Sequence, residues 1–139
     1  MSDREAPLGP CERDDLLHPW IGPGTPYRSA VLAVSGGPDS TALMGCAALL
    51  DAAIPLLVAT VDHGLRQSSR AEAEGVADLA ARFGLPHRIL SWTGPKPAAR
   101  LQAAARAERY RLLAALADEA GADLVLTAHT RDDQAETVL

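Results

Sequence analysis

Residue types that usually build disulfide or metal-bound frameworks are scarce in this chain. Cysteine occurs only twice in 139 residues, at Cys11 and Cys46, and neither lies in a C-x-x-C pair. This spacing supports neither a zinc site nor a disulfide framework. Lysine occurs once, at Lys96, so twelve of the thirteen basic residues are arginines. Arginine suits bidentate phosphate contacts, but we favour codon composition as the reason for its abundance.

Long apolar runs and a surplus of basic residues are also missing. No stretch is apolar enough to span a membrane, and the polar, proline-rich first residues do not resemble a signal peptide. We therefore expect a cytoplasmic protein with no membrane partner. The formal net charge of −5 argues against a general nucleic-acid-binding surface, although it leaves room for a local basic site.

What remains is the composition of one globular domain. Apolar residues make up 47% and charged residues 22% of the chain, and the length suits a single domain. Residues 1–29 are rich in proline and glycine and are interpreted as a loose N-terminal arm. Residues 30–139 are expected to form the domain. Because Leu139 lies in a helical pattern without a stop signal, we expect this domain to be truncated and the chain to be the N-terminal portion of a longer protein.

Short apolar runs alternate with helical patterns after residue 30. Strands are expected at 30–34, 56–61, 87–92 and 123–128, and helices at 41–53, 69–83, 101–119 and after about Arg131. Ser69 and Glu72 form the sequence pattern of a capping box, while Gly84 and Gly121 mark helix ends. This alternation predicts an α/β fold, a Rossmann-like parallel sheet with helices on both faces.

The first strand runs into a glycine-rich segment with the sequence SGGPDS. Adjacent glycines permit close approach of a ligand and φ values that other residues avoid, and the N-terminus of the following helix attracts phosphate. No Walker A lysine follows, so the acid in the segment suggests a bridging Mg²⁺. The alternative is an ordinary turn between strand and helix. The residues concerned are Ser35, Gly36, Gly37, Pro38, Asp39 and Ser40.

Two further polar clusters follow strands. The sequence DHGLR, with His63, follows the second strand, and HTRDDQAET, with Asp133 and Glu136, follows the fourth. In a parallel sheet these segments and the glycine-rich loop share the rim where ligands bind. If the last segment is helical, Asp133 and Glu136 lie on one face, where a cation would relieve their repulsion. The alternatives are a surface histidine and acids that merely favour a helix N-terminus.

The long helix carries Gln102, Arg106 and Arg109, with Tyr110 beside them. The two arginines share a face because they are three residues apart. They can point at a phosphate or RNA, or form a solvated face with Glu108 as partner; helical spacing leaves both options open.

The segment SGGPDS resembles the S-G-G-x-D-S loop of the PP-loop ATP pyrophosphatases, whose fold is also called adenine nucleotide α-hydrolase-like. Together with V-D-H-G-L-R, Q-A-x-A-R-x-x-R-Y and H-x-x-D-D-Q-A-E-T, it resembles the tRNA(Ile)-lysidine synthetase family over residues 30–139. That resemblance implies a ligase that uses ATP to adenylate the wobble cytidine of a CAU-anticodon tRNA(Ile). Free L-lysine then displaces AMP to give lysidine.

The resemblance also implies roles for individual residues. Asp39, Arg109, Asp133 and Glu136 match catalytic positions, and Asp39 and Asp133 are the expected Mg²⁺ ligands. The segment Ser35–Ser40, His63 and His129 match positions that bind ATP. Thr130 departs from the family, many members of which carry a second histidine there.

Other functions stay open at this point. One is a different PP-loop enzyme for tRNA thiolation or amide synthesis, although a thiolase of the 2-thiocytidine kind would need C-x-x-C ligands. Another is an ATP-binding fragment without activity of its own. We expect most of the tRNA-recognition surface to lie outside this acidic chain, and a homodimer is one assembly that the sequence permits.

Overall fold

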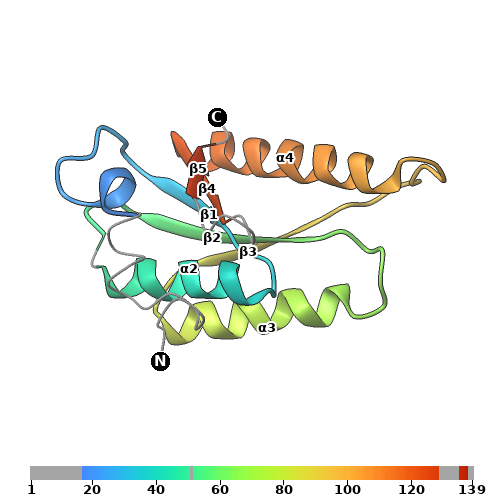
Figure 1. Cartoon of the computed structure of the whole chain (residues 1–139), viewed down its shortest axis with the longest axis horizontal. Helices are drawn as coiled ribbons and strands as arrows, with labels where there is room; N and C mark the ends of the chain where they lie inside the picture. Colours follow the sequence, from blue (N-terminus) through green and yellow to red (C-terminus); the bar gives the residue numbers. More distant parts are fainter. Residues whose placement is uncertain (1–16, 51, 129–134, 138–139) are drawn as a thin grey trace, which may run out of the picture.

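The computed structural model describes residues 17–50, 52–128 and 135–137, with the backbone alone for Pro38, Asp39, Ala128 and 135–137 (Figure 1). Residues 17–21 are helical and precede eight elements. In chain order these are β1 (Ala30–Ala33), α2 (Pro38–Leu49), β2 (Leu56–Asp62), α3 (Ser69–Arg82), β3 (His87–Ser91), α4 (Leu101–Ala120), β4 (Leu124–Ala128) and β5 (Ala135–Thr137).

The strands form one sheet in the order β3-β2-β1-β4-β5. β1 to β4 pair in parallel, and β5 pairs antiparallel with β4. The chain builds the sheet outward from β1 to β3 and then returns to place β4 on the other side of β1. The predicted α/β fold with a mainly parallel sheet is therefore confirmed.

The helices cover both faces of this sheet, as predicted. In Figure 1, α2 and α3 lie on one face and α4 lies on the other. Successive residues of β1 serve the two faces in turn: Leu32 packs in the core that contains Leu43 of α2, and Val31 packs in the core that contains Leu113 of α4. Burying each such side chain contributes about 1.5–3 kcal/mol. No helix among the described residues is both long and apolar enough to cross a membrane.

Part of the predicted arm packs against the domain. Leu17 and Ile21 are fully buried in the core, and the Ala53 N–H donates a hydrogen bond to the Ile21 carbonyl at 2.9 Å. The Arg28 N–H donates to the Asp123 carboxylate at 2.9 Å, and this bond holds the pKa of Asp123 below its usual value. Residues 17–29 are thus tied to the sheet.

Three local expectations need correction. α2 begins at Pro38 rather than near residue 41, since proline suits a first helical position. α3 begins at Ser69, but its N-cap is Ser68 without a side-chain cap bond, so the predicted capping box does not form. The helix expected after Arg131 is wrong for residues 135–137, which form β5. These residues pair with an edge of β4 that would otherwise carry unpaired backbone groups.

Candidate functional site

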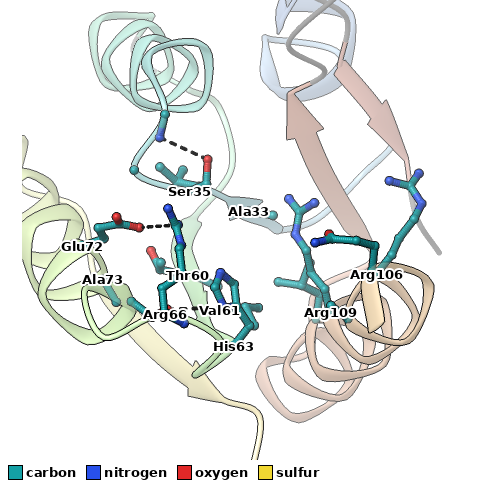
Figure 2. Close-up of a pocket in the computed structure, with 18 residues that line it drawn as sticks. Ala33, Ser35, Thr60, Val61, His63, Arg66, Glu72, Ala73, Arg106 and Arg109 are labelled. Carbon is teal, nitrogen blue, oxygen red and sulfur yellow. Dashed lines mark hydrogen bonds and ion pairs between the residues drawn. The ribbon is translucent and has the colours of Figure 1, made fainter. Parts of the chain in front are cut away.

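A pocket of about 560 Å³ lies at the carboxyl ends of β1 and β2. Figure 2 shows its two walls, one formed by the β1–α2 loop and α3, the other by α4. The lining residues are Ala33, Val34, Ser35, Gly36, Gly37, Ala59, Thr60, Val61, His63, Arg66, Ser69, Glu72, Ala73, Gln102, Ala105, Arg106, Arg109 and Leu113. The pocket thus occupies the rim where a parallel sheet of this kind binds its ligands.

The glycine-rich loop lines the pocket through Ser35, Gly36 and Gly37. The Gly37 N–H donates to Ser35 Oγ at 3.2 Å, and Thr41 Oγ1 donates to the Gly37 carbonyl at 2.8 Å. Gly37 has φ −74° and Gly36 has no positive φ, so the prediction of unusual φ values is wrong here. The glycines instead leave space: a Cβ on Gly36 would meet only Glu72, with its Cβ 3.7 Å away.

The same loop ends at the N-terminus of α2. Gly37 is the N-cap and makes no side-chain cap bond, so no cap side chain covers the first turn. The N–H groups of such a turn and its positive dipole end attract phosphate. Ser40 in this turn is 7% exposed and lies outside the pocket lining.

The segment after β2 forms the next part of the rim. Gly64 has φ +67°, a conformation that favours glycine, and the Leu65 N–H donates to Nδ1 of His63 at 3.1 Å. When the ring is neutral, this acceptor role places its proton on Nε2. Arg66 pairs with Glu72 at 2.9 Å across the start of α3. Both side chains line the pocket. Glu72 is the acid of the predicted capping box, and its carboxylate pairs with Arg66 instead.

The other wall belongs to α4. Gln102, Arg106 and Arg109 line the pocket from one side of this helix. Figure 2 shows both arginines extending from α4 across the pocket from Ser35 and Glu72. Glu108 instead hydrogen-bonds Arg111, with 2.8 Å between Oε1 and Nε, and this contact lowers the pKa of Glu108. Glu108, the partner considered for the two pocket arginines, is thus paired with Arg111.

The described lining is rich in positive charge. It carries Arg66, Arg106 and Arg109 against the single carboxylate of Glu72, within a chain of net charge −5. Small apolar side chains, including Ala33 and Ala59, line the space between these groups. Such a pocket suits an anion joined to a flat apolar group, which is the chemistry of a nucleotide.

The predicted site residues do not all meet in the pocket, and one of them, Ser40, is described but lies outside its lining. The structure brings Ser35, Gly36, Gly37, His63 and Arg109 together in one pocket.

For Pro38 and Asp39 it places the backbone in the first turn of α2, and for Glu136 it places the backbone in β5. The predictions for His129 and Asp133 lie outside the described residues. Among the described residues, no group of three His, Cys, Asp or Glu side chains could hold a metal ion.

One polar contact of a lining residue was not predicted. Thr60 lines the pocket at 4% exposure, and its Oγ1 lies 2.9 Å from Nε2 of His87 on β3. Partial burial lowers the pKa of His87. A threonine inside the apolar run of β2 was the signal in the sequence, but its partner depends on the register between β2 and β3.

Comparisons with known proteins agree with this geometry. The model of the PP-loop domain family matches residues 14–139. A tRNA(Ile)-lysidine synthase from Methylobacterium sp. (strain 4-46) is 66% identical over 139 residues, which are all of this chain and 40% of that protein. The tRNA(Ile)-lysidine synthase of Bradyrhizobium sp. (strain BTAi1) is 53% identical over 143 residues, all of this chain and 39% of that protein. The chain spans about two fifths of the length of these relatives.

Solved structures with low sequence identity share the fold. The U34-tRNA thiolase NcsA from Methanococcus maripaludis has a TM-score of 0.72 at 17% identity, covering 88% of this chain and 46% of that one. An NH3-dependent NAD synthetase from Campylobacter jejuni has a TM-score of 0.60 at 16% identity, covering 94% and 57%. These likenesses support the Rossmann-like arrangement of the sheet and helices.

Proposed function

Because this chain belongs to the PP-loop domain family, we propose that it is the ATP-binding part of a tRNA(Ile)-lysidine synthase. The observation that carries the proposal is the 66% identity to a tRNA(Ile)-lysidine synthase over every residue of the chain. The substrates are ATP, free L-lysine and a tRNA(Ile) with a CAU anticodon. The reaction takes place in the cytoplasm.

The pocket suggests how ATP lies. Its phosphates contact Ser35, Gly36, Gly37 and the first turn of α2, where backbone N–H groups stabilise negative charge. Its adenosine lies against the small apolar side chains that line the rest of the pocket, such as Ala59. A nucleotide held in this way leaves its α-phosphate facing the arginines of α4.

The proposed reaction has two steps. The C2 carbonyl oxygen of the wobble cytidine attacks the α-phosphorus of ATP, and the bond to the bridging oxygen of the β-phosphate breaks, releasing pyrophosphate. The ε-amine of lysine then attacks C2, the C2–O bond breaks, AMP leaves and the amine loses a proton. Arg109 stabilises the charge on the phosphates. Asp133 and Glu136 are the proposed acids beside the cytidine, where they accept a proton or stabilise positive charge.

Magnesium is the proposed cofactor. An Mg²⁺ ion bound with ATP takes most of its ligands from phosphate oxygens and water and needs only one or two carboxylates. The chain offers Asp39 in the first turn of α2 and Asp133, so its donor chemistry fits such an ion. When bound, Mg²⁺ would neutralise charge on the pyrophosphate leaving group.

The test uses the complete natural protein that carries this sequence. It is incubated with Mg-ATP, lysine and unmodified CAU-anticodon tRNA(Ile), and the wobble nucleoside is weighed by mass spectrometry. We expect a cytidine heavier by lysine less water, and an Asp39→Asn variant should lose this product. AMP release with an unchanged cytidine would point to another substrate of a PP-loop enzyme. No ATP cleavage at all would leave an ATP-binding module.

A further inference from the structure

Basic residues are concentrated in one segment of this acidic chain. Residues 93–111 contain five basic residues and one acidic residue, a net charge of +4. The rest of the chain has eight basic and 17 acidic residues, a net charge of −9. The segment comprises the loop after β3 and the first half of α4. A polyanion is therefore attracted to this segment and repelled by most of the remaining chain.

Three cations of this segment lie at the rim of the pocket. The Lys96 ammonium donates to the Trp92 carbonyl at 3.2 Å and lies 5.0 Å from the centre of the Trp92 ring. It also lies 3.6 Å from the position that a Cβ on Gly64 would occupy. Gly64 directly follows His63, which lines the pocket. Arg100 is exposed and is the N-cap of α4, two residues before Gln102 of the lining.

Arg106 is the third cation at the rim, and it also lines the pocket. It is exposed, lines the pocket and has its guanidinium carbon 4.8 Å from the centre of the Tyr110 ring. A guanidinium packed on a ring is held in one orientation and still offers N–H groups at its edge. We define Lys96, Arg100 and Arg106 as the basic rim.

We propose that the basic rim binds the phosphate backbone of the tRNA anticodon arm, beside the nucleotide that enters the pocket. This inference rests on the proposed function, in which the tRNA brings its wobble cytidine to the pocket that this edge borders. The charges complement each other, since RNA presents regularly spaced phosphates and the rim presents cations anchored on Trp92 and Tyr110. The basic rim is the contribution that we propose for this domain.

The test measures tRNA binding by the complete natural protein at several salt concentrations. The variant Lys96→Gln/Arg100→Gln removes two rim cations that do not line the pocket. We expect its Kd for CAU-anticodon tRNA to rise about tenfold at moderate salt, and the slope of log K against log salt to become less negative by about 1.5. The KM for ATP should change less than about twofold.

Two controls separate this role from a structural one. Lys96→Arg/Arg100→Lys keeps both charges and should bind tRNA like the wild type. Arg88→Gln removes one positive charge at the far end of α4, where Arg88 pairs with Glu119 at 3.2 Å, and should leave the salt slope unchanged. A Lys96→Gln/Arg100→Gln variant with a wild-type Kd and salt slope would overturn the inference. Failure of the proposed function gives a different result, namely a wild-type protein that makes no lysidine.

Discussion

Arg109 and Arg111 lie two residues apart on α4 but have different surroundings. Arg109 lines the pocket, whereas Arg111 is 65% exposed and pairs with Glu108. If Arg109 contacts a phosphate of ATP, its removal costs a charge-assisted hydrogen bond of about 1.5–3 kcal/mol. We therefore expect Arg109→Gln to lower kcat/KM about 10- to 100-fold. AMP release in the presence of tRNA and lysine measures this effect.

Arg111→Gln is the matched control for that measurement. It removes the same charge from the same helix, but from a surface pair that water and salt screen, so the pair contributes little. Its kcat/KM should stay within about twofold of the wild type. Equal losses in both variants would mean that net charge, rather than contact in the pocket, explains the effect of Arg109.

Gly36 offers a second test on the scale of one residue. Its backbone has no positive φ, and a Cβ there would meet only Glu72 at 3.7 Å. Gly36→Ala should therefore leave the unfolding midpoint nearly unchanged. It should raise the KM for ATP about tenfold or more if phosphate approaches this backbone closely. An unchanged KM for ATP would show that the loop does not need glycine for its ligand.

On the scale of elements, the pair of Thr60 and His87 joins β2 to β3. Burial lowers the pKa of His87, so the folded chain binds fewer protons there than the unfolded chain. The free energy of unfolding should therefore rise with pH up to about 6.5, the pKa of an unfolded histidine, and then level off. This dependence should be weaker in His87→Gln, which urea unfolding at pH 5.5 and 7.5 can test. An identical pH dependence in both proteins would exclude His87 as the source.

Two glycine substitutions, one inside α3 and one just after it, should change the free energy of unfolding in opposite directions. Gly75 lies inside α3 and is exposed, and a Cβ added there would have nothing within 4 Å, whereas Gly84 follows α3 with φ +74°. Gly75→Ala should raise the free energy of unfolding by about 0.5–1 kcal/mol. Gly84→Ala should lower it by about 1 kcal/mol, because the left-handed conformation strains a side chain. Urea unfolding compares the two, and effects of the same sign would contradict the argument.

Elements that depend on local patterns were predictable from the sequence. β1 and β4 were placed to within one residue because each is a short, mainly apolar run, and α4 ends at Gly121, which has the left-handed conformation typical of a helix end. β5 was not predictable, because it depends on the free edge of a strand already in place. The capping box failed for a similar reason: Arg66, six residues away from Glu72, competes for its carboxylate.

In the candidate site, too, features that follow from local patterns were predictable and features that depend on contacts between distant elements were not. Ser35 and His63 were predicted in one pocket because both follow parallel strands, whose ends meet at one rim. Thr60 and His87 were missed because their contact depends on strand register, in which Thr60 lies opposite Ile89. The hydrogen bond from the Arg28 N–H to Asp123 was likewise hidden, because it joins residues that are 95 positions apart in the chain.

On the scale of the whole molecule, the pocket joins three separate parts of the chain. Residues 33–37, 59–73 and 102–113 contribute to its lining, so a ligand bound there contacts structure from both faces of the sheet. Such a ligand stabilises the folded state by about 2.7 kcal/mol at a concentration of 100 times its Kd. For a chain of this size, that corresponds to a rise of roughly 10 °C in Tm with Mg-ATP.

The ligand series in this experiment identifies which part of ATP is bound. Tripolyphosphate can contact the glycine-rich loop but cannot cover the apolar wall, so at equal concentration it should raise Tm less than ATP. Gly36→Ala should reduce both shifts, since it changes the surface that the two ligands share. Equal shifts from tripolyphosphate and ATP would mean that the pocket binds only the anion. No shift with ATP would mean that the folded chain does not bind the nucleotide, because a ligand that binds the native state must stabilise it.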